Sequence, residues 1–314
     1  MGAQDDTGFS TRQVHVGASA APASPRATPI YLTAGFTFSD LDESAAHFAT
    51  GSGFGYTRTG NPTVQAVEER LASLEGGDQA ILVSSGQAAV TVALLGLLDA
   101  GDHIVVSEHI YEGTRGLLLD NFSRLGIQAT FVDTSDPAAW RAAITPRTKA
   151  LFAETLSNAR NDVLDVAAVA KIGAERGVPL VVDSTFTTPY LLRPIEHGAA
   201  IVVHSASKFL AGQGAVLGGV IVDDGRFDAV ASGHLFPHLV QTDRLGGASY
   251  AEKYGRRARG QYLRESVAPR FGPSPSPLNA FLIGQGVETL SLRVERQSAN
   301  ALAVAQWLET RPEV

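Results

Sequence analysis

Short apolar runs of strand length recur between residues 79 and 222. They cover 79–84, 103–107, 128–132, 150–154, 179–183, 199–203 and 216–222. Patterns of helical period lie between several of them, as in 86–98, 137–144 and 165–176. This alternation is typical of parallel strands, which need a crossover connection because a tight turn cannot join them. The sequence therefore predicts an α/β fold with a mostly parallel sheet covered by helices on both faces.

Two of these strands end in side chains that can carry chemistry. One ends at Asp183, and the next is followed by Ser205, Ser207 and Lys208. Ligands of open α/β sheets bind at the carboxyl ends of the strands, so Asp183 and Lys208 can face one ligand. A lysine that forms a Schiff base and a carboxylate that pairs with a pyridinium nitrogen are what pyridoxal 5'-phosphate requires. An isolated lysine after a strand is usually only a solvated side chain, and Asp183 is what favours the cofactor here.

Anion binding is also indicated at the turn Ser85-Gly86-Gln87, where a strand passes into a helix. Free amides at a helix N-terminus bind phosphate readily. The turn lacks the Lys-Ser/Thr ending of a Walker loop and the glycine spacing of a dinucleotide fingerprint. The glycines of 212–219 have no strand-turn-helix context either, which argues against a nucleotide-binding protein.

Some loop residues have both a structural and a functional interpretation. Tyr56 and Arg58 precede Asn61-Pro62, a strong helix start, and are either a surface turn or an anion clamp. Tyr111 is either a half-buried structural ring or a ring that stacks on a flat ligand. Asn158 needs no explanation beyond its turn.

Composition excludes several classes of function. Lys and Arg total 25 against 32 Asp and Glu, giving a net charge of −7 without a basic block, which argues against nucleic-acid binding. The chain has no cysteine, and His234 and His238 flank Pro237 without an acidic third ligand, so we expect no metal site. No apolar run is long enough to cross a membrane and no signal peptide is evident, so we expect a cytoplasmic protein.

The domain organisation expected from composition has three parts. Residues 1–60 read as an N-terminal arm with little periodicity, 61–277 as a large cofactor-binding domain, and 278–314 as a long helix opening a second domain. The Pro-rich segment 272–277 marks the boundary between the last two parts. A long irregular arm usually packs on something else, and a partner subunit is one candidate.

In order and spacing, these motifs resemble the Cys/Met-metabolism family of pyridoxal phosphate enzymes, and most closely its O-acetylhomoserine sulfhydrylase branch. The resemblance rests on 29–31, 56–63, 84–89, 188–191 and 285–290. It implies a type I, aspartate aminotransferase-like fold. It also implies γ-replacement on O-acetyl-L-homoserine by sulfide or a thiol, giving homocysteine or methionine plus acetate.

The resemblance also implies a role for each candidate residue. Lys208 would hold the cofactor and move protons, and Tyr111 would stack on the ring and act in proton transfer to the leaving group. Asp183 would pair with the ring nitrogen, and Asn158 would reach the ring hydroxyl. The phosphate would be bound by Gly86, Gln87, Ser205 and Ser207. Tyr56 and Arg58 would reach a neighbouring subunit's site, which implies a dimer as the minimum unit and a tetramer as the expected assembly.

Departures from the family pattern leave alternatives open. Ser207 stands where Thr is common, which keeps the hydroxyl, and Ser184 and Ala159 replace a usual Asn and Pro. Gln213 replaces a frequent His, with no predictable effect. Family members continue beyond the long helix into a C-terminal domain with a carboxylate-binding arginine, so we expect that domain to be incomplete here. Cystathionine γ-synthase or methionine γ-lyase activity, or a cofactor-binding fragment without turnover, are the alternatives.

Overall fold

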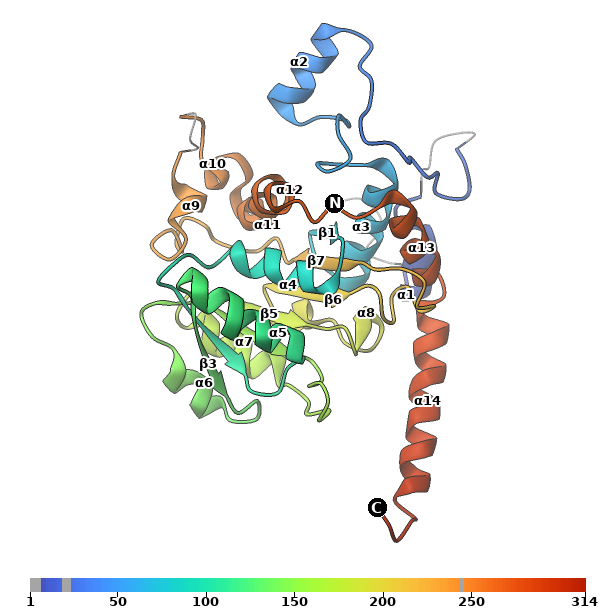
Figure 1. Ribbon diagram of the computed structural model, residues 1–314, viewed down its shortest axis with the longest axis vertical. Helices are drawn as coiled ribbons and strands as arrows, with labels where there is room; N and C mark the ends of the chain where they lie inside the picture. Colours follow the sequence, from blue (N-terminus) through green and yellow to red (C-terminus); the bar gives the residue numbers. More distant parts are fainter. Residues whose placement is uncertain (1–6, 19–23, 243–245) are drawn as a thin grey trace.

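The predicted mixed sheet is present in the computed structural model, which describes residues 7–18, 24–242 and 246–314 (Figure 1). Its strands are β1 (Gln79–Val83), β2 (His103–Ser107), β3 (Gln128–Val132), β4 (Thr148–Glu154), β5 (Leu180–Asp183), β6 (Ile201–Ser205) and β7 (Gly219–Asp223). They lie in the order β1-β7-β6-β5-β4-β2-β3, and only β7 is antiparallel to its neighbours. The predicted α/β class and mostly parallel sheet are therefore confirmed.

Helices cover both faces of this sheet (Figure 1). The central ones are α3 (Pro62–Glu75), α4 (Gly86–Leu95), α5 (Glu112–Gly116), α6 (Pro137–Ala143), α7 (Val166–Ala174) and α8 (Thr188–Leu191). Later ones are α9 (Pro237–Val240), α10 (Tyr250–Tyr254), α11 (Ala258–Tyr262), α12 (Ala268–Phe271), α13 (Pro277–Val287) and α14 (Leu290–Leu308). Short 3-10 or π segments are η1 (Leu117–Phe122), η2 (Ser123–Leu125), η3 (Pro194–His197), η4 (Gly255–Arg257) and η5 (Leu263–Val267).

Two apolar cores, one on each face, follow from the alternation of side chains along the strands. Val182 and Val202 belong to the core under α3, α7 and α13, whereas Val181 and Val203 belong to the core under α4 and α11. Successive side chains of a strand point to opposite faces, so strands that are apolar throughout must be covered on both sides.

The start of α3 shows how local sequence sets an element. The Asn61 side chain accepts a hydrogen bond from Thr63 N–H, Pro62 occupies the first helical position, and Gly76 ends the helix with φ of 77°. Asparagine is among the best N-caps and glycine adopts a positive φ without steric cost. The helix start predicted at Asn61-Pro62 is therefore confirmed.

Three segments differ from the sequence-based prediction. The arm of residues 1–60, expected to have little periodicity, contains α1 (Phe9–His15) and α2 (Leu41–Thr50). Helix α2 is capped by Asp40 and has an apolar repeat in Leu41, Ala45 and Phe48, but it buries none of its residues. The glycine-rich segment 232–260, for which the sequence indicates no helix, contains α9, α10 with a Ser249/Glu252 capping box, and η4. The long helix expected within 278–314 is present as α14, but the residues before it form a separate helix, α13, and Arg293 Nη2 donates to Gly286 O at 2.6 Å across the junction.

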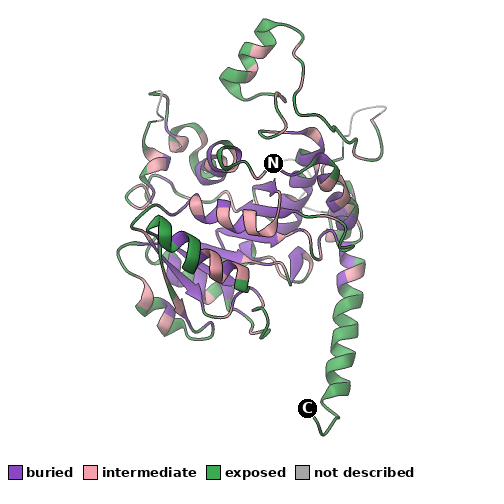
Figure 2. Cartoon of the chain, in the orientation of Figure 1, coloured by how far each residue is buried: buried purple, intermediate pink, exposed green. Residues whose placement is uncertain are grey.

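The last helix leaves the body of the molecule after its first turns (Figure 2). Only Leu290, Ser291 and Val294 of α14 are buried, and Gln13 of α1 donates to Ser291 Oγ at 2.9 Å. The division into arm, large domain and final helix stays a prediction. No helix in the described part of the chain is long and apolar enough to cross a membrane.

A buried ion pair ties α11 to the end of the sheet. The Arg259 side chain is 1% exposed, and its Nε and Nη2 lie 2.6 Å from Asp223 Oδ2 and 2.7 Å from Asp224 Oδ1. Its Nη2 also donates to Ala200 O at 2.8 Å. A charged pair removed from water is tolerated only when hydrogen bonds of this kind satisfy it.

We expect Arg259→Ala to lower the free energy of unfolding by about 3–5 kcal/mol, because Asp223 would remain buried without its cation. The control is Arg257→Ala, which removes a half-exposed ion pair with Asp78 and should cost no more than about 1 kcal/mol. Urea unfolding of both variants measures the difference. Similar losses in the two variants would contradict a special role for Arg259.

Candidate active site

A cavity of about 660 Å³ lies at the carboxyl ends of the central strands. It is lined by most of the residues that the sequence singled out: Gly86, Gln87, Tyr111, Asn158, Asp183, Ser205, Ser207 and Lys208. They come from five separate connections along the chain. The parallel register explains their meeting, since it places Glu154 beside Asp183 and Asp183 beside Val203.

Asp183 is the last residue of β5 and forms part of the cavity wall. Its Oδ1 accepts the backbone N–H of Thr185 at 2.9 Å. No Lys, Arg or His forms an ion pair with it in the described part of the chain. Burial raises the pKa of the Asp183 carboxyl, and the hydrogen bonds from Thr185 oppose that rise. A cationic ring nitrogen in the cavity would remove this cost.

Lys208 is the one lysine of four in the sequence that lines the cavity. Its backbone N–H donates to Ser205 O at 3.1 Å, which places it in a tight turn after β6. Its amine makes no hydrogen bond or ion pair with the described residues. By contrast, Lys149 Nζ donates to Leu235 O at 2.7 Å. The amine that faces the cavity is therefore available for a covalent bond to a ligand.

The turn before α4 has the form expected of an anion site. Ser85 caps the helix by accepting Ala88 N–H at 3.1 Å, while the amides of Gly86 and Gln87 have no partner in the described part of the chain. A Cβ at Gly86 would lie 2.6 Å from Ser205 Cβ, so only glycine lets the turn approach β6 this closely. Ser207 Oγ is already held by Gly218, whose N–H donates to it at 3.0 Å. Two free amides and the Ser205 hydroxyl thus converge on one place.

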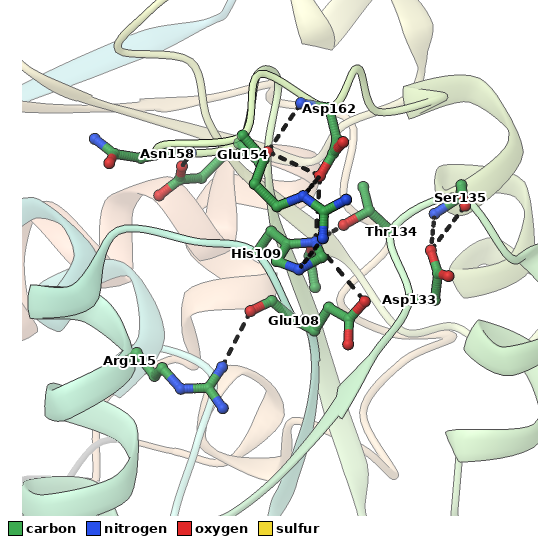
Figure 3. A network of polar contacts seen from close by, with 12 residues as sticks. Glu108, His109, Arg115, Asp133, Thr134, Ser135, Glu154, Asn158 and Asp162 are labelled. Carbon is green, nitrogen blue, oxygen red and sulfur yellow. Dashed lines mark hydrogen bonds and ion pairs between the residues drawn. The ribbon is translucent and has the colours of Figure 1, made fainter.

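Glu154, at the end of β4, is a site residue that the sequence analysis missed. It is 5% exposed, and its Oε1 and Oε2 accept the N–H groups of Tyr111 at 2.6 Å and Asn158 at 2.9 Å. Burial, with the Asp183 charge as a smaller cause, raises the pKa of Glu154 to about 7. Figure 3 shows its carboxylate beside Asn158. An apolar strand that ends in a carboxylate could have identified Glu154 from the sequence, as this pattern identified Asp183.

Thr185 was also missed. Its hydroxyl accepts Ser205 N–H at 2.8 Å, which links the turn after β5 to the end of β6. Nothing in the spacing of Asp183 and Thr185 distinguishes this contact from an ordinary turn, because the partner lies in another strand. Only the sheet order reveals it.

Tyr56 and Arg58 do not line this cavity. Arg58 lies in a separate groove of about 810 Å³, beside Asn61 and Arg264, and its Nη1 donates to Pro269 O at 2.6 Å. Tyr56 is 48% exposed. Within one chain, the structure therefore does not bring these two residues to Lys208.

The cavity residues fit pyridoxal phosphate. A free lysine amine, a buried carboxylate without a cation and two free helix-terminal amides match the aldehyde, the ring nitrogen and the phosphate of that cofactor. We find no cluster of His, Asp and Glu suited to a metal ion among the residues that the structure describes.

Comparisons with known proteins show the family of this chain. Residues 10–314 match the family described as Cys/Met metabolism PLP-dependent enzyme. O-acetyl-L-homoserine sulfhydrylase of Corynebacterium glutamicum is 44% identical over 99% of this chain and 72% of its own length. L-methionine gamma-lyase of Treponema denticola is 37% identical over 98% of this chain and 70% of its own length.

A solved structure shows the same fold. It is that of a Campylobacter jejuni protein assigned as an O-acetylhomoserine (thiol)-lyase, which contains a lysine carrying a pyridoxyl phosphate group. It is 31% identical, with a TM-score of 0.93 over 98% of this chain and 76% of that one. The chain therefore belongs to the Cys/Met metabolism family of PLP-dependent enzymes.

Proposed function

We propose that this protein catalyses γ-replacement on O-acetyl-L-homoserine, in which sulfide or a thiol replaces acetate and homocysteine or methionine is formed. It is a PLP-dependent transferase that forms a carbon-sulfur bond in a small amino-acid substrate. The observation that carries the proposal is the free Lys208 amine in one cavity with Asp183, in a chain 44% identical to a sulfhydrylase.

The reaction needs negative charge to develop beside the substrate's α-carbon. Bound pyridoxal phosphate supplies an electron sink for that charge. Lys208 Nζ holds the cofactor and then removes and returns protons at the substrate carbons. Asp183 keeps a proton on the ring nitrogen, because an ionised carboxylate beside that nitrogen favours its charged form.

The remaining cavity residues bind and orient. The Gly86 and Gln87 amides, with the Ser205 and Ser207 hydroxyls, bind the phosphate. Tyr111 would stack on the ring, and its hydroxyl would move a proton toward the leaving acetate. Asn158 binds the ring hydroxyl. These roles are supported by the placement of all six residues around one cavity.

The active unit that we propose is a dimer, with a tetramer as the assembled form, in which Tyr56 and Arg58 serve the cavity of the neighbouring subunit. Support comes from the position of Arg58, which lies outside the cavity of its own chain. The exposed apolar side chains of the arm, among them Leu32, Leu41 and Phe48, also fit a subunit contact. The cytoplasmic location stays a prediction.

With O-acetyl-L-homoserine and sulfide, we expect acetate and homocysteine to appear in equal amounts. The value of kcat/KM should exceed that for methionine by at least about tenfold, a difference of about 1.4 kcal/mol in transition-state binding. Product analysis by mass spectrometry measures both reactions. Rapid conversion of methionine to a keto acid without added thiol would instead favour a γ-lyase.

Shared sites predict complementation between inactive variants. Lys208→Ala and Arg58→Ala should each have little activity alone, the second through weak cofactor retention. A mixed dimer would contain one site with both Lys208 and Arg58 intact, so co-expressed variants should recover about a quarter of the wild-type activity. If the mixture has only the average activity of the separate variants, each subunit supplies its own arginine.

A further inference from the structure

Glu154 is buried at the floor of the cavity, yet the proposed chemistry assigns it no role. It ends β4 directly beside Asp183 of β5, so two carboxyl groups occupy adjacent positions at the sheet edge. Lys208 lines the same cavity, but no Lys, Arg or His lies within ion-pair distance of Glu154 in the described part of the chain. A carboxylate kept there without a cation is costly and needs another reason.

The hydrogen bonds of Glu154 provide that reason. One oxygen accepts the N–H of Tyr111, in the loop after β2, and the other accepts the N–H of Asn158, in the loop after β4. Two N–H groups pointing at one side chain require two acceptors, and an ionised carboxylate has acceptors only. An amide of the same shape would present an NH₂ group to one of them. The charge is therefore needed to hold both loops at once.

The same two loops are joined again farther from the cavity (Figure 3). His109 Nδ1 lies 3.2 Å from Asp162 Oδ2, and its Nε2 lies 3.1 Å from Arg160 Nη1. A neutral imidazole with its hydrogen on Nδ1 satisfies both contacts, since Nε2 then accepts from the arginine. This outer contact is 28% exposed at His109. Glu154 is therefore the buried side chain that contacts the backbone of both Tyr111 and Asn158.

We propose that Glu154 is a positioning residue, which sets the places of Tyr111 and Asn158 in the cavity by accepting one backbone N–H from each. This inference rests on the proposed function for its catalytic consequence, because Tyr111 would stack on the cofactor ring and Asn158 would bind the ring hydroxyl. The contacts themselves belong to this chain and do not depend on the cofactor.

The test uses Glu154→Gln, which keeps the size of the side chain and removes one acceptor. The matched control is Glu68→Gln, since Glu68 is also buried, accepts Leu82 N–H at 2.7 Å and lies outside the cavity. Hydrogen–deuterium exchange is followed by mass spectrometry in peptides that cover residues 111 and 158. We expect exchange at one or both sites to become about tenfold faster in Glu154→Gln and to stay unchanged in Glu68→Gln.

A second readout follows the cofactor itself. In protein loaded with pyridoxal phosphate, the visible circular dichroism reports the asymmetry around the ring. We expect Glu154→Gln to alter this signal and to lower kcat more than it raises KM, whereas Glu68→Gln leaves both unchanged. The wild-type signal and kcat should also fall as the pH drops below about 7, because a protonated carboxyl offers one acceptor fewer.

The outcomes separate the two proposals. Unchanged exchange at both residues would overturn the positioning role, whether or not the protein binds the cofactor. Faster exchange with an unchanged dichroism signal would also overturn it. Faster exchange in a protein that turns over no O-acetylhomoserine would support the role of Glu154 while contradicting the proposed function.

Discussion

The site depends on the parallel pairing of β4, β5 and β6, which brings the ends of three strands to one edge of the sheet. In this register Glu154 lies beside Asp183, and the strand that follows leads through Ser205 to Lys208. These residues are far apart in the chain, and no local structure could bring them together. Because both faces of the strands are buried in apolar cores, a slip in register by one residue would move the valines of one core into the other, which would disturb the packing of both and displace the site.

The burial of ionisable groups is the second constraint on the site. Glu154 and Asp183 both have a raised pKa, since burial disfavours their ionised forms. Each carboxyl group is held by backbone N–H groups instead of a cation of this chain. Among the residues that the structure describes, the Lys208 amine and the amides of Gly86 and Gln87 have no hydrogen-bond partner. The cavity thus presents a set of polar groups that a ligand with a cationic nitrogen, an aldehyde and a phosphate would satisfy.

The sequence was sufficient to predict the sheet, and also those cavity residues that follow strands, because apolar runs and turn chemistry are local signals. Asp183 and Lys208 were found in this way. Glu154 also ends an apolar strand, but its role depends on two backbone N–H groups. These belong to loops that only the order of the strands in the sheet brings near Glu154. Helix α2 has an apolar repeat in Leu41, Ala45 and Phe48, which the sequence-based prediction of an irregular arm overlooked, and the helix buries none of its residues. The break before α14 depends on Arg293 contacting Gly286, which no propensity encodes.

The most direct test of the account is to find which lysine binds the cofactor. The protein would be incubated with pyridoxal phosphate, reduced with borohydride, digested and analysed by mass spectrometry. We expect the added mass on the peptide that contains Lys208, and none on peptides containing Lys149, Lys171 or Lys253. A label on another lysine, or no label on any of the four, would contradict the assignment of this cavity as the cofactor site.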